Sequence, residues 1–156
     1  MSRMPDDSDV DLRVPRQRLE LPRAPWAVLG GIAAGGAIGA GARYELGVHF
    51  PTPPPAFPWT TFVINVVGCL LIGVLMVLVT DVWPGRPLMR PFLGVGVLGG
   101  FTTFSAYAVE LQQLVAAGAV GVAAAYLAGT AVVALGATWL GLAATRRIVR
   151  LAGARG

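Results

Sequence analysis

One stretch of eight residues combines paired glycines with polar threonines inside a long hydrophobic run: Leu98-Gly99-Gly100-Phe101-Thr102-Thr103-Phe104-Ser105. The run extends from about residue 88 to residue 117, which is longer than one straight membrane-spanning helix requires. Glycine pairs and threonines are poor helix formers. We therefore predict two half-helices joined by an unwound segment. Irregular backbone at membrane depth is tolerated only where protein or a wet cavity covers it, so the break is a candidate functional site.

Three further apolar segments accompany this run, over about residues 26–48, 59–80 and 120–145. Each is close to the roughly 20 residues that cross a bilayer. The chain is 55% hydrophobic and 13% charged, against about 25% charged residues in soluble domains. Together these features predict an all-α membrane protein with four transmembrane helices, of which the third is broken mid-membrane.

The charged residues lie mainly outside the segments. Residues 1–25 are polar and proline-interrupted, which predicts a disordered cytoplasmic N-tail. Residues 26–145 form the predicted four-helix transmembrane domain and residues 146–156 a basic C-tail. Arginines gather in the N-tail, the loop near residue 86 and the C-tail, whereas residues 45–58 and 118–119 contain no Arg or Lys. The positive-inside rule then places both termini in the cytoplasm. In a membrane protein such charge meets lipid headgroups, so we expect no nucleic-acid partner.

Several motifs argue against an enzyme. Residues 94–99 match the G-x-G-x-x-G pattern, but no strand precedes them, so they do not indicate a dinucleotide site. Cys69 and His49 are each the only residue of their type, which argues against a disulfide or a transition-metal site.

Glycines 31, 35 and 39 form a small-xxx-small stripe that could pack within the chain or form a dimer face.

A few polar and aromatic residues inside the segments are candidates for a polar path. Asn65 lies mid-span and could either bond a neighbouring helix or offer its amide to an anion. Ring edges are electropositive, so aromatic residues near the break could hold a small anion. Arg43 could snorkel or attract anions, and Glu110 could pair helices or line a vestibule. Phe104 and Tyr107 could equally be a packing pair, and the hydroxyls of Thr130 and Thr138 could either bond back to their own helix or replace lost water around an ion.

Three segments taken together resemble the CrcB/Fluc fluoride channel family: residues 39–44 (GAGARY), 65–69 (NVVGC) and 99–105 (GGFTTFS). The resemblance covers about residues 26–145. It implies an antiparallel dimer with two fluoride pores and a structural sodium ion at the dimer centre. The sodium ligands would be the backbone carbonyls of Gly99 and Thr102. The resemblance also implies which residues line the fluoride pore: Asn65, Phe104, Tyr107, Ser105, Thr130 and Thr138. Arg43 and Glu110 would lie in its vestibule. Two positions depart from the family pattern, since Tyr107 replaces a usual phenylalanine and Ala134 a frequent hydroxyl residue. The number of working pores therefore stays open.

The resulting functional prediction is a channel in the plasma membrane that passively exports fluoride and lowers its cytoplasmic toxicity. The strong arginine bias predicts insertion in one orientation and pairing with an oppositely oriented paralogue, although pairing with a second copy of this chain is the alternative. Two other functions stay open from the residues: a small multidrug-type proton-coupled exporter and a non-transporting membrane assembly subunit. The exporter would need a carboxylate deep in the first span, where only Glu45 is present near the end.

Overall fold

The computed structural model describes residues 25–153 except 84, 85 and 87. The predicted N-tail lies outside these residues apart from Pro25. The described residues form helices and no strand, which confirms the all-α prediction. The helices are α2 (Pro25–His49), α3 (Trp59–Val77), η1 (Leu78–Val82), η2 (Arg90–Leu98), α4 (Gly99–Phe101), α5 (Phe104–Ala116) and α6 (Val120–Gly153), where η denotes π-helical turns.

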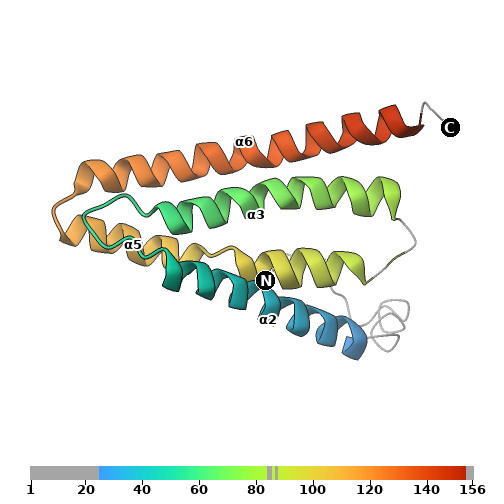
Figure 1. Ribbon diagram of the computed structural model, residues 1–156, viewed down its shortest axis with the longest axis horizontal. Coiled ribbons are helices and arrows are strands. Elements are labelled where there is room, and N and C mark those ends of the chain that lie inside the picture. Colours follow the sequence, from blue (N-terminus) through green and yellow to red (C-terminus); the bar gives the residue numbers. More distant parts are fainter. Residues whose placement is uncertain (1–24, 84–85, 87, 154–156) are drawn as a thin grey trace, which may run out of the picture.

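The chain runs back and forth along one long axis (Figure 1). Helix α3 packs mainly on α6, whereas α2 packs mainly on η2 and α4. The start of α2, the connection after η1 and the end of α6 lie at one end of the bundle, and the 50–58 loop and the turn before α6 lie at the other. This arrangement puts the described arginines of that connection and of α6 at the same end.

Three segments are long and apolar enough to cross a membrane: Trp59–Val82, Arg90–Ala116 and Val120–Gly153. They match three of the four predicted spans. Helix α2, the first predicted span, has 25 residues but is not among these three. The third segment contains two residues with extended backbone, Thr102 and Thr103.

The glycine stripe of α2 packs inside the chain. A Cβ atom added at Gly35 would lie 2.5 Å from the Phe92 carbonyl oxygen, and one at Gly39 would lie 2.0 Å from the Val97 carbonyl oxygen. Small residues allow such close approach of two backbones. Of the two readings left open for this stripe, the structure therefore supports packing between α2 and the η2–α4 segment.

Helix α6 does not end at residue 145, where the basic C-tail is predicted to begin. It continues to Gly153 and includes Arg146, Arg147 and Arg150. Arginine is a good helix former, and no proline or glycine occurs between Gly141 and Gly153 to end the helix. The first part of the tail is therefore helical.

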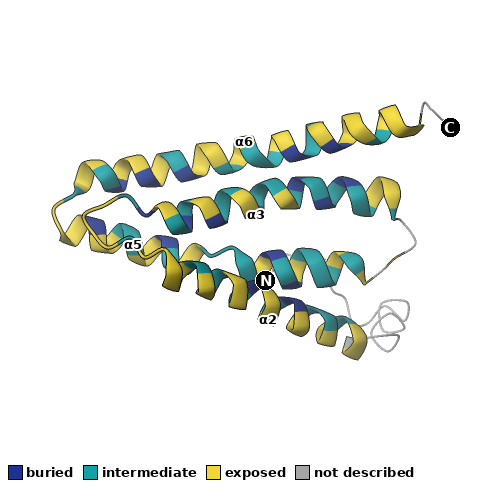
Figure 2. Ribbon diagram, viewed as in Figure 1, coloured by how far each residue is buried: buried dark blue, intermediate teal, exposed yellow. Residues whose placement is uncertain are grey.

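Exposed positions occur along all the long helices (Figure 2), and many of them are large apolar residues. Ile38, Leu135 and Trp139 are exposed, while the buried set includes the polar residues Thr61, Thr130 and Thr145. Exposed apolar patches of this extent are rare in soluble monomers. The distribution fits a protein whose surrounding solvent is lipid, which agrees with the predicted membrane location in general terms.

Candidate functional site

The interruption between α4 and α5 is built from hydroxyl groups. Thr102 has φ −77° and ψ 158°, and its Oγ1 donates to the Leu98 carbonyl oxygen at 2.9 Å. Thr103 has φ −149° and ψ 124°, and its Oγ1 accepts from the Ala106 N–H at 3.1 Å. Thr103 is thus the N-cap of α5, a role that threonine performs well. The local sequence therefore ends one helix and begins the next within two residues.

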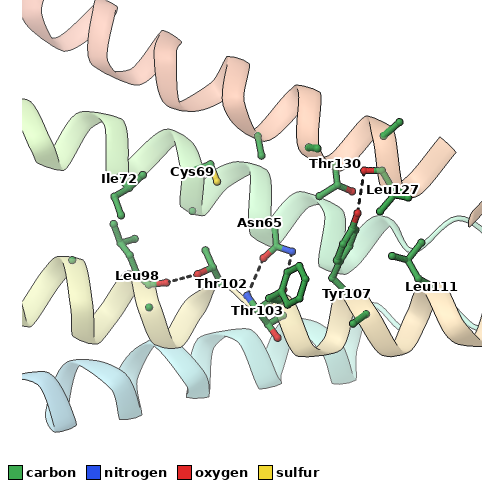
Figure 3. Close-up of a pocket in the computed structure, with 18 residues that line it drawn as sticks. Asn65, Cys69, Ile72, Leu98, Thr102, Thr103, Tyr107, Leu111, Leu127 and Thr130 are labelled. Atoms are coloured by element: carbon green, nitrogen blue, oxygen red, sulfur yellow. Dashed lines mark hydrogen bonds between the residues drawn. The ribbon is translucent and has the colours of Figure 1, made fainter. Parts of the chain in front are cut away.

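Asn65 on α3 holds this interruption from the side (Figure 3). Its Nδ2 donates to the Thr103 carbonyl oxygen at 3.0 Å, and its Oδ1 accepts from the Thr103 N–H at 2.9 Å. The side-chain amide thereby pairs with both polar groups of a residue that has left the helical ladder. Of the two roles open to Asn65, the structure shows the hydrogen bonds to a neighbouring segment. The second N–H of Nδ2 is left for another acceptor.

In a continuous helix, the carbonyl groups of Gly99 and Thr102 would each accept a hydrogen bond from the N–H group four residues later. At the interruption these two N–H groups bond elsewhere. The Thr103 N–H, which would reach Gly99, donates to Asn65, and the Ala106 N–H, which would reach Thr102, donates to the Thr103 hydroxyl. The Gly100 carbonyl oxygen accepts from Arg43 Nε at 3.1 Å. Arg43 is half-buried and binds the end of α4, a contact that its sequence position alone did not indicate.

Replacing Arg43 tests this contact. We expect Arg43→Gln to lower the melting temperature by several degrees, because the carbonyl end of α4 loses a charged donor worth about 1.5–3 kcal/mol. Arg43→Lys keeps the charge but loses the planar donor geometry, so only partial recovery is expected. Thermal unfolding in detergent measures both variants. Full recovery by lysine would mean that charge alone matters at this position.

A groove of about 850 Å³ opens beside the interruption, between α3, the segment from η2 to α5, and α6 (Figure 3). It brings together several of the predicted pore and sodium residues: Asn65, Gly99, Thr102, Phe104, Tyr107 and Thr130. Its remaining lining is mostly small or apolar and includes Cys69 and Ala134. Residues from three separate segments thus share one apolar groove with a few polar groups.

The aromatic and hydroxyl groups of the groove differ in their surroundings. Phe104 is 80% exposed, and its ring centroid lies 5.8 Å from that of Tyr107. Tyr107 is buried and its hydroxyl donates to the Leu127 carbonyl oxygen at 3.0 Å. Thr130 Oγ1 is the one buried side-chain polar atom without a hydrogen-bond partner among the described residues. An unpartnered buried hydroxyl in a native structure calls for a ligand or water.

Two predicted pore residues do not line this groove. Thr138 lies two turns beyond Thr130, and its hydroxyl donates to the Ala134 carbonyl oxygen of its own helix at 3.1 Å. Ser105 is exposed, with its Oγ 3.2 Å from Thr103 Oγ1. Their pore roles stay predictions. Self-bonding is common for threonine in apolar helices, and spacing alone does not reveal it.

Glu110 lies in a polar cluster one turn beyond Tyr107. Its Oε1 accepts from the Thr61 hydroxyl and its Oε2 from the Tyr126 hydroxyl, each at 2.6 Å. Thr61 and Tyr126 come from α3 and α6, so the carboxylate links three helices. Thr61 is not among the site residues predicted from the sequence. Because α3 also contains Thr60 and Asn65, the polar side chain of Thr61 alone does not reveal its partner.

Replacing Glu110 by glutamine is expected to destabilise the bundle, because one of the two hydroxyl donors would face an amide N–H₂ group. Charge-assisted hydrogen bonds of this kind contribute about 1.5–3 kcal/mol. The loss is measured as a lower melting temperature in detergent. Glu45→Gln, at an exposed carboxylate, is the matched control. Equal effects of the two variants would contradict a structural role for the cluster.

A helical bundle with an apolar outside defines an all-α membrane protein, and polar groups collected at a helix interruption are typical of membrane channels and carriers. The sequence comparisons agree and are more specific. The profile of the family described as "CrcB-like protein, Camphor Resistance (CrcB)" matches residues 31–142. The chain belongs to the CrcB family, as its sequence motifs predict.

The chain is similar to several curated members of this family. It is 52% identical over 128 residues to "Fluoride-specific ion channel FluC 1" of Streptomyces coelicolor, covering 82% of this chain and 83% of that protein. It is 54% identical over 126 residues to "Fluoride-specific ion channel FluC 2" of Nocardia farcinica, covering 81% and 90%. It is 46% identical over 121 residues to "Fluoride-specific ion channel FluC" of Rhodospirillum centenum, covering 76% and 94%.

Proposed function

We propose that this protein is a fluoride-specific ion channel that lets fluoride leave the cell passively. Membership of the CrcB family and relatives named as fluoride-specific channels over most of their length support this function. They favour it over the multidrug-type exporter and the non-transporting subunit. A channel breaks no covalent bond of its substrate, so the protein is not an enzyme.

The observation that carries the proposal is the groove at the α4–α5 interruption, because its polar groups suit a small dehydrated anion. Fluoride is strongly hydrated, so a narrow path must replace its lost water with donors. The second amide hydrogen of Asn65 and the hydroxyl of Thr130 are available donors. The ring edges of Phe104 and Tyr107 add weak positive potential. Larger halides would gain less from the same groups.

The proposed assembly is an antiparallel dimer of four-span subunits whose third span is broken within the membrane. Helix α2 is about 37 Å long at 1.5 Å per residue, enough for a fourth span. Its exposed side chains include Trp26, Leu29 and Ile38, which suit lipid. The exposure of Phe104 beside an open groove suits a site that a second subunit would complete.

A sodium ion at the dimer centre fits the carbonyl groups of the interruption. The oxygens of Gly99 and Thr102 lack the N–H partners that a continuous helix would supply, and carbonyl oxygens suit a hard cation. These two carbonyls from each subunit would hold the ion. A bound cation would neutralise the carbonyl dipoles and add positive potential near the anion path.

The proposed location is the plasma membrane, with both termini in the cytoplasm. The described arginines of the 83–90 region and of α6 lie at one end of the bundle, whereas the other end of α2 contains Glu45, His49 and a single arginine, the half-buried Arg43. Such bias favours a single orientation and hence a heterodimer with an oppositely oriented paralogue. Tags on both termini, labelled from either side of the membrane, test the orientation. Equal labelling from both sides would favour a homodimer instead.

Ion efflux from liposomes tests the function. The chain is purified alone or after co-expression with an oppositely oriented paralogue, and is placed in vesicles. When a potassium ionophore lets K⁺ move and prevents a membrane voltage from building up, these vesicles are expected to release fluoride and to retain chloride. Protein-free vesicles are the control. Proton-coupled uptake of quaternary amines without fluoride release would contradict the proposal and favour the multidrug-type exporter.

A further inference from the structure

The C-terminal end of α6, which the proposed orientation places in the cytoplasm, carries a cluster of three arginines that the proposed channel function does not use. Arg146, Arg147 and Arg150 are exposed and line one hollow of about 480 Å³ together with Ala143 and Leu151. Figure 1 shows that this end of α6 projects beyond α3. We refer to these five residues as the arginine hollow.

The arginine hollow lies at the level expected for lipid headgroups. Helix α6 has 34 residues and is about 51 Å long, which exceeds the roughly 30 Å hydrocarbon core by several turns. A Cβ atom added at Gly141 of α6 would lie 3.2 Å from the backbone nitrogen of Val74 in α3. These two residues therefore lie at the same height along the bundle. Since α3 and α6 run in the same direction, Arg146 to Arg150 lie near the level of Val82, where the α3 span ends.

The chemistry of the hollow suits one phosphodiester with attached hydrocarbon. Arg146 and Arg150 are one helical turn apart, and Arg147 lies beside them, so three guanidinium groups can converge on one anion. The short side chain of Ala143 leaves space between them, and Leu151 adds an apolar contact. None of the three forms an ion pair with a carboxylate of the described residues.

We propose that the arginine hollow binds the phosphate of an anionic glycerophospholipid in the cytoplasmic leaflet. A membrane-level position and the apolar members Ala143 and Leu151 favour a lipid over free phosphate. The three positive charges favour an anionic lipid over a zwitterionic one. The site would anchor the long end of α6 at the headgroup layer and does not depend on which ion the channel conducts.

Native mass spectrometry of the full-length protein titrated with phosphatidylglycerol or phosphatidylcholine tests the proposal. The triple variant Arg146→Gln, Arg147→Gln, Arg150→Gln is expected to weaken phosphatidylglycerol binding at least about tenfold and to leave phosphatidylcholine binding unchanged. The corresponding lysine triple variant keeps the charges and is expected to recover most of the loss. Arg13→Gln, Arg16→Gln, Arg18→Gln removes the same charge from the N-tail and is the matched control.

Three outcomes would overturn the proposal. Equal loss in the N-tail control would mean that net charge, and not the arginine hollow, attracts the lipid. Unchanged phosphatidylglycerol binding by the glutamine triple variant would exclude the hollow as the site. Displacement of the lipid by millimolar inorganic phosphate would assign the hollow to free phosphate instead.

Discussion

Fluoride flux is expected to fall about a hundredfold or more when Asn65 is replaced by aspartate. In the native chain the amide donates to the Thr103 carbonyl oxygen and accepts from the Thr103 N–H. An aspartate carboxylate would still accept from the Thr103 N–H. Its other oxygen would carry negative charge to about 3.0 Å from the Thr103 carbonyl oxygen. It also places negative charge beside the proposed anion path, which repels fluoride. Each tenfold decrease in flux corresponds to about 1.4 kcal/mol. The contact with the carbonyl oxygen and the repulsion of fluoride, at about this size each, together give a hundredfold decrease.

Liposome efflux measures this loss, and Gln113→Glu is the matched control. Gln113 is an exposed amide on α5, so the same amide-to-acid change there adds equal charge away from the interruption. We expect control flux within about twofold of the native value, since Gln113 lies in the last turn of α5, away from the interruption at Thr102 and Thr103. Native-like flux in Asn65→Asp would remove Asn65 from the conducting path, provided that the variant elutes from a size-exclusion column at the same volume as the native protein.

Replacing Gly39 by alanine is expected to destabilise the fold strongly, although it adds a single methyl group. The new Cβ would lie 2.0 Å from the Val97 carbonyl oxygen and 2.7 Å from Phe101 N. Both contacts are with backbone atoms, so no side chain can rotate away and α2 must move as a whole. Overpacking of this kind costs about 1–3 kcal/mol, and more where the backbone cannot shift.

The melting temperature in detergent and the yield of monodisperse protein measure this effect. Gly36→Ala is the matched control, because a Cβ at Gly36 has no atom within 4 Å. It is expected to be neutral or slightly stabilising, since alanine favours a helix over glycine by about 0.5–1 kcal/mol. A similar loss in both variants would mean that the close α2–η2 contact is not the cause.

The order of apolar segments and the position of the interruption could be read from the sequence because both depend on local composition. Long hydrophobic runs predict spans in lipid. The Gly99–Gly100 pair followed by two threonines weakens the helix at that point and supplies the N-cap of the next one. The extended backbone at Thr102 and Thr103 is therefore a local consequence of these residues.

The partners of the polar side chains could not be read in this way. Asn65 and Thr103 are 38 residues apart, Arg43 and Gly100 are 57 apart, and Thr61 and Glu110 are 49 apart. In a soluble helix the apolar face identifies the side that packs inward. In lipid both the packed face and the outer face are apolar, so hydrophobic periodicity does not identify the inward face.

The sequence by itself thus determined that this protein is a helical membrane protein of the CrcB family, with an interruption in its third long apolar segment. Only the tertiary structure decided what holds that interruption in place. It brought Asn65 to the Thr103 peptide, Arg43 to the Gly100 carbonyl and Thr130 to the groove, while leaving Thr138 bonded to its own helix. The physical reason is that these contacts require close approach of distant helices, which the glycines of α2, η2, α4 and α6 permit through backbone packing.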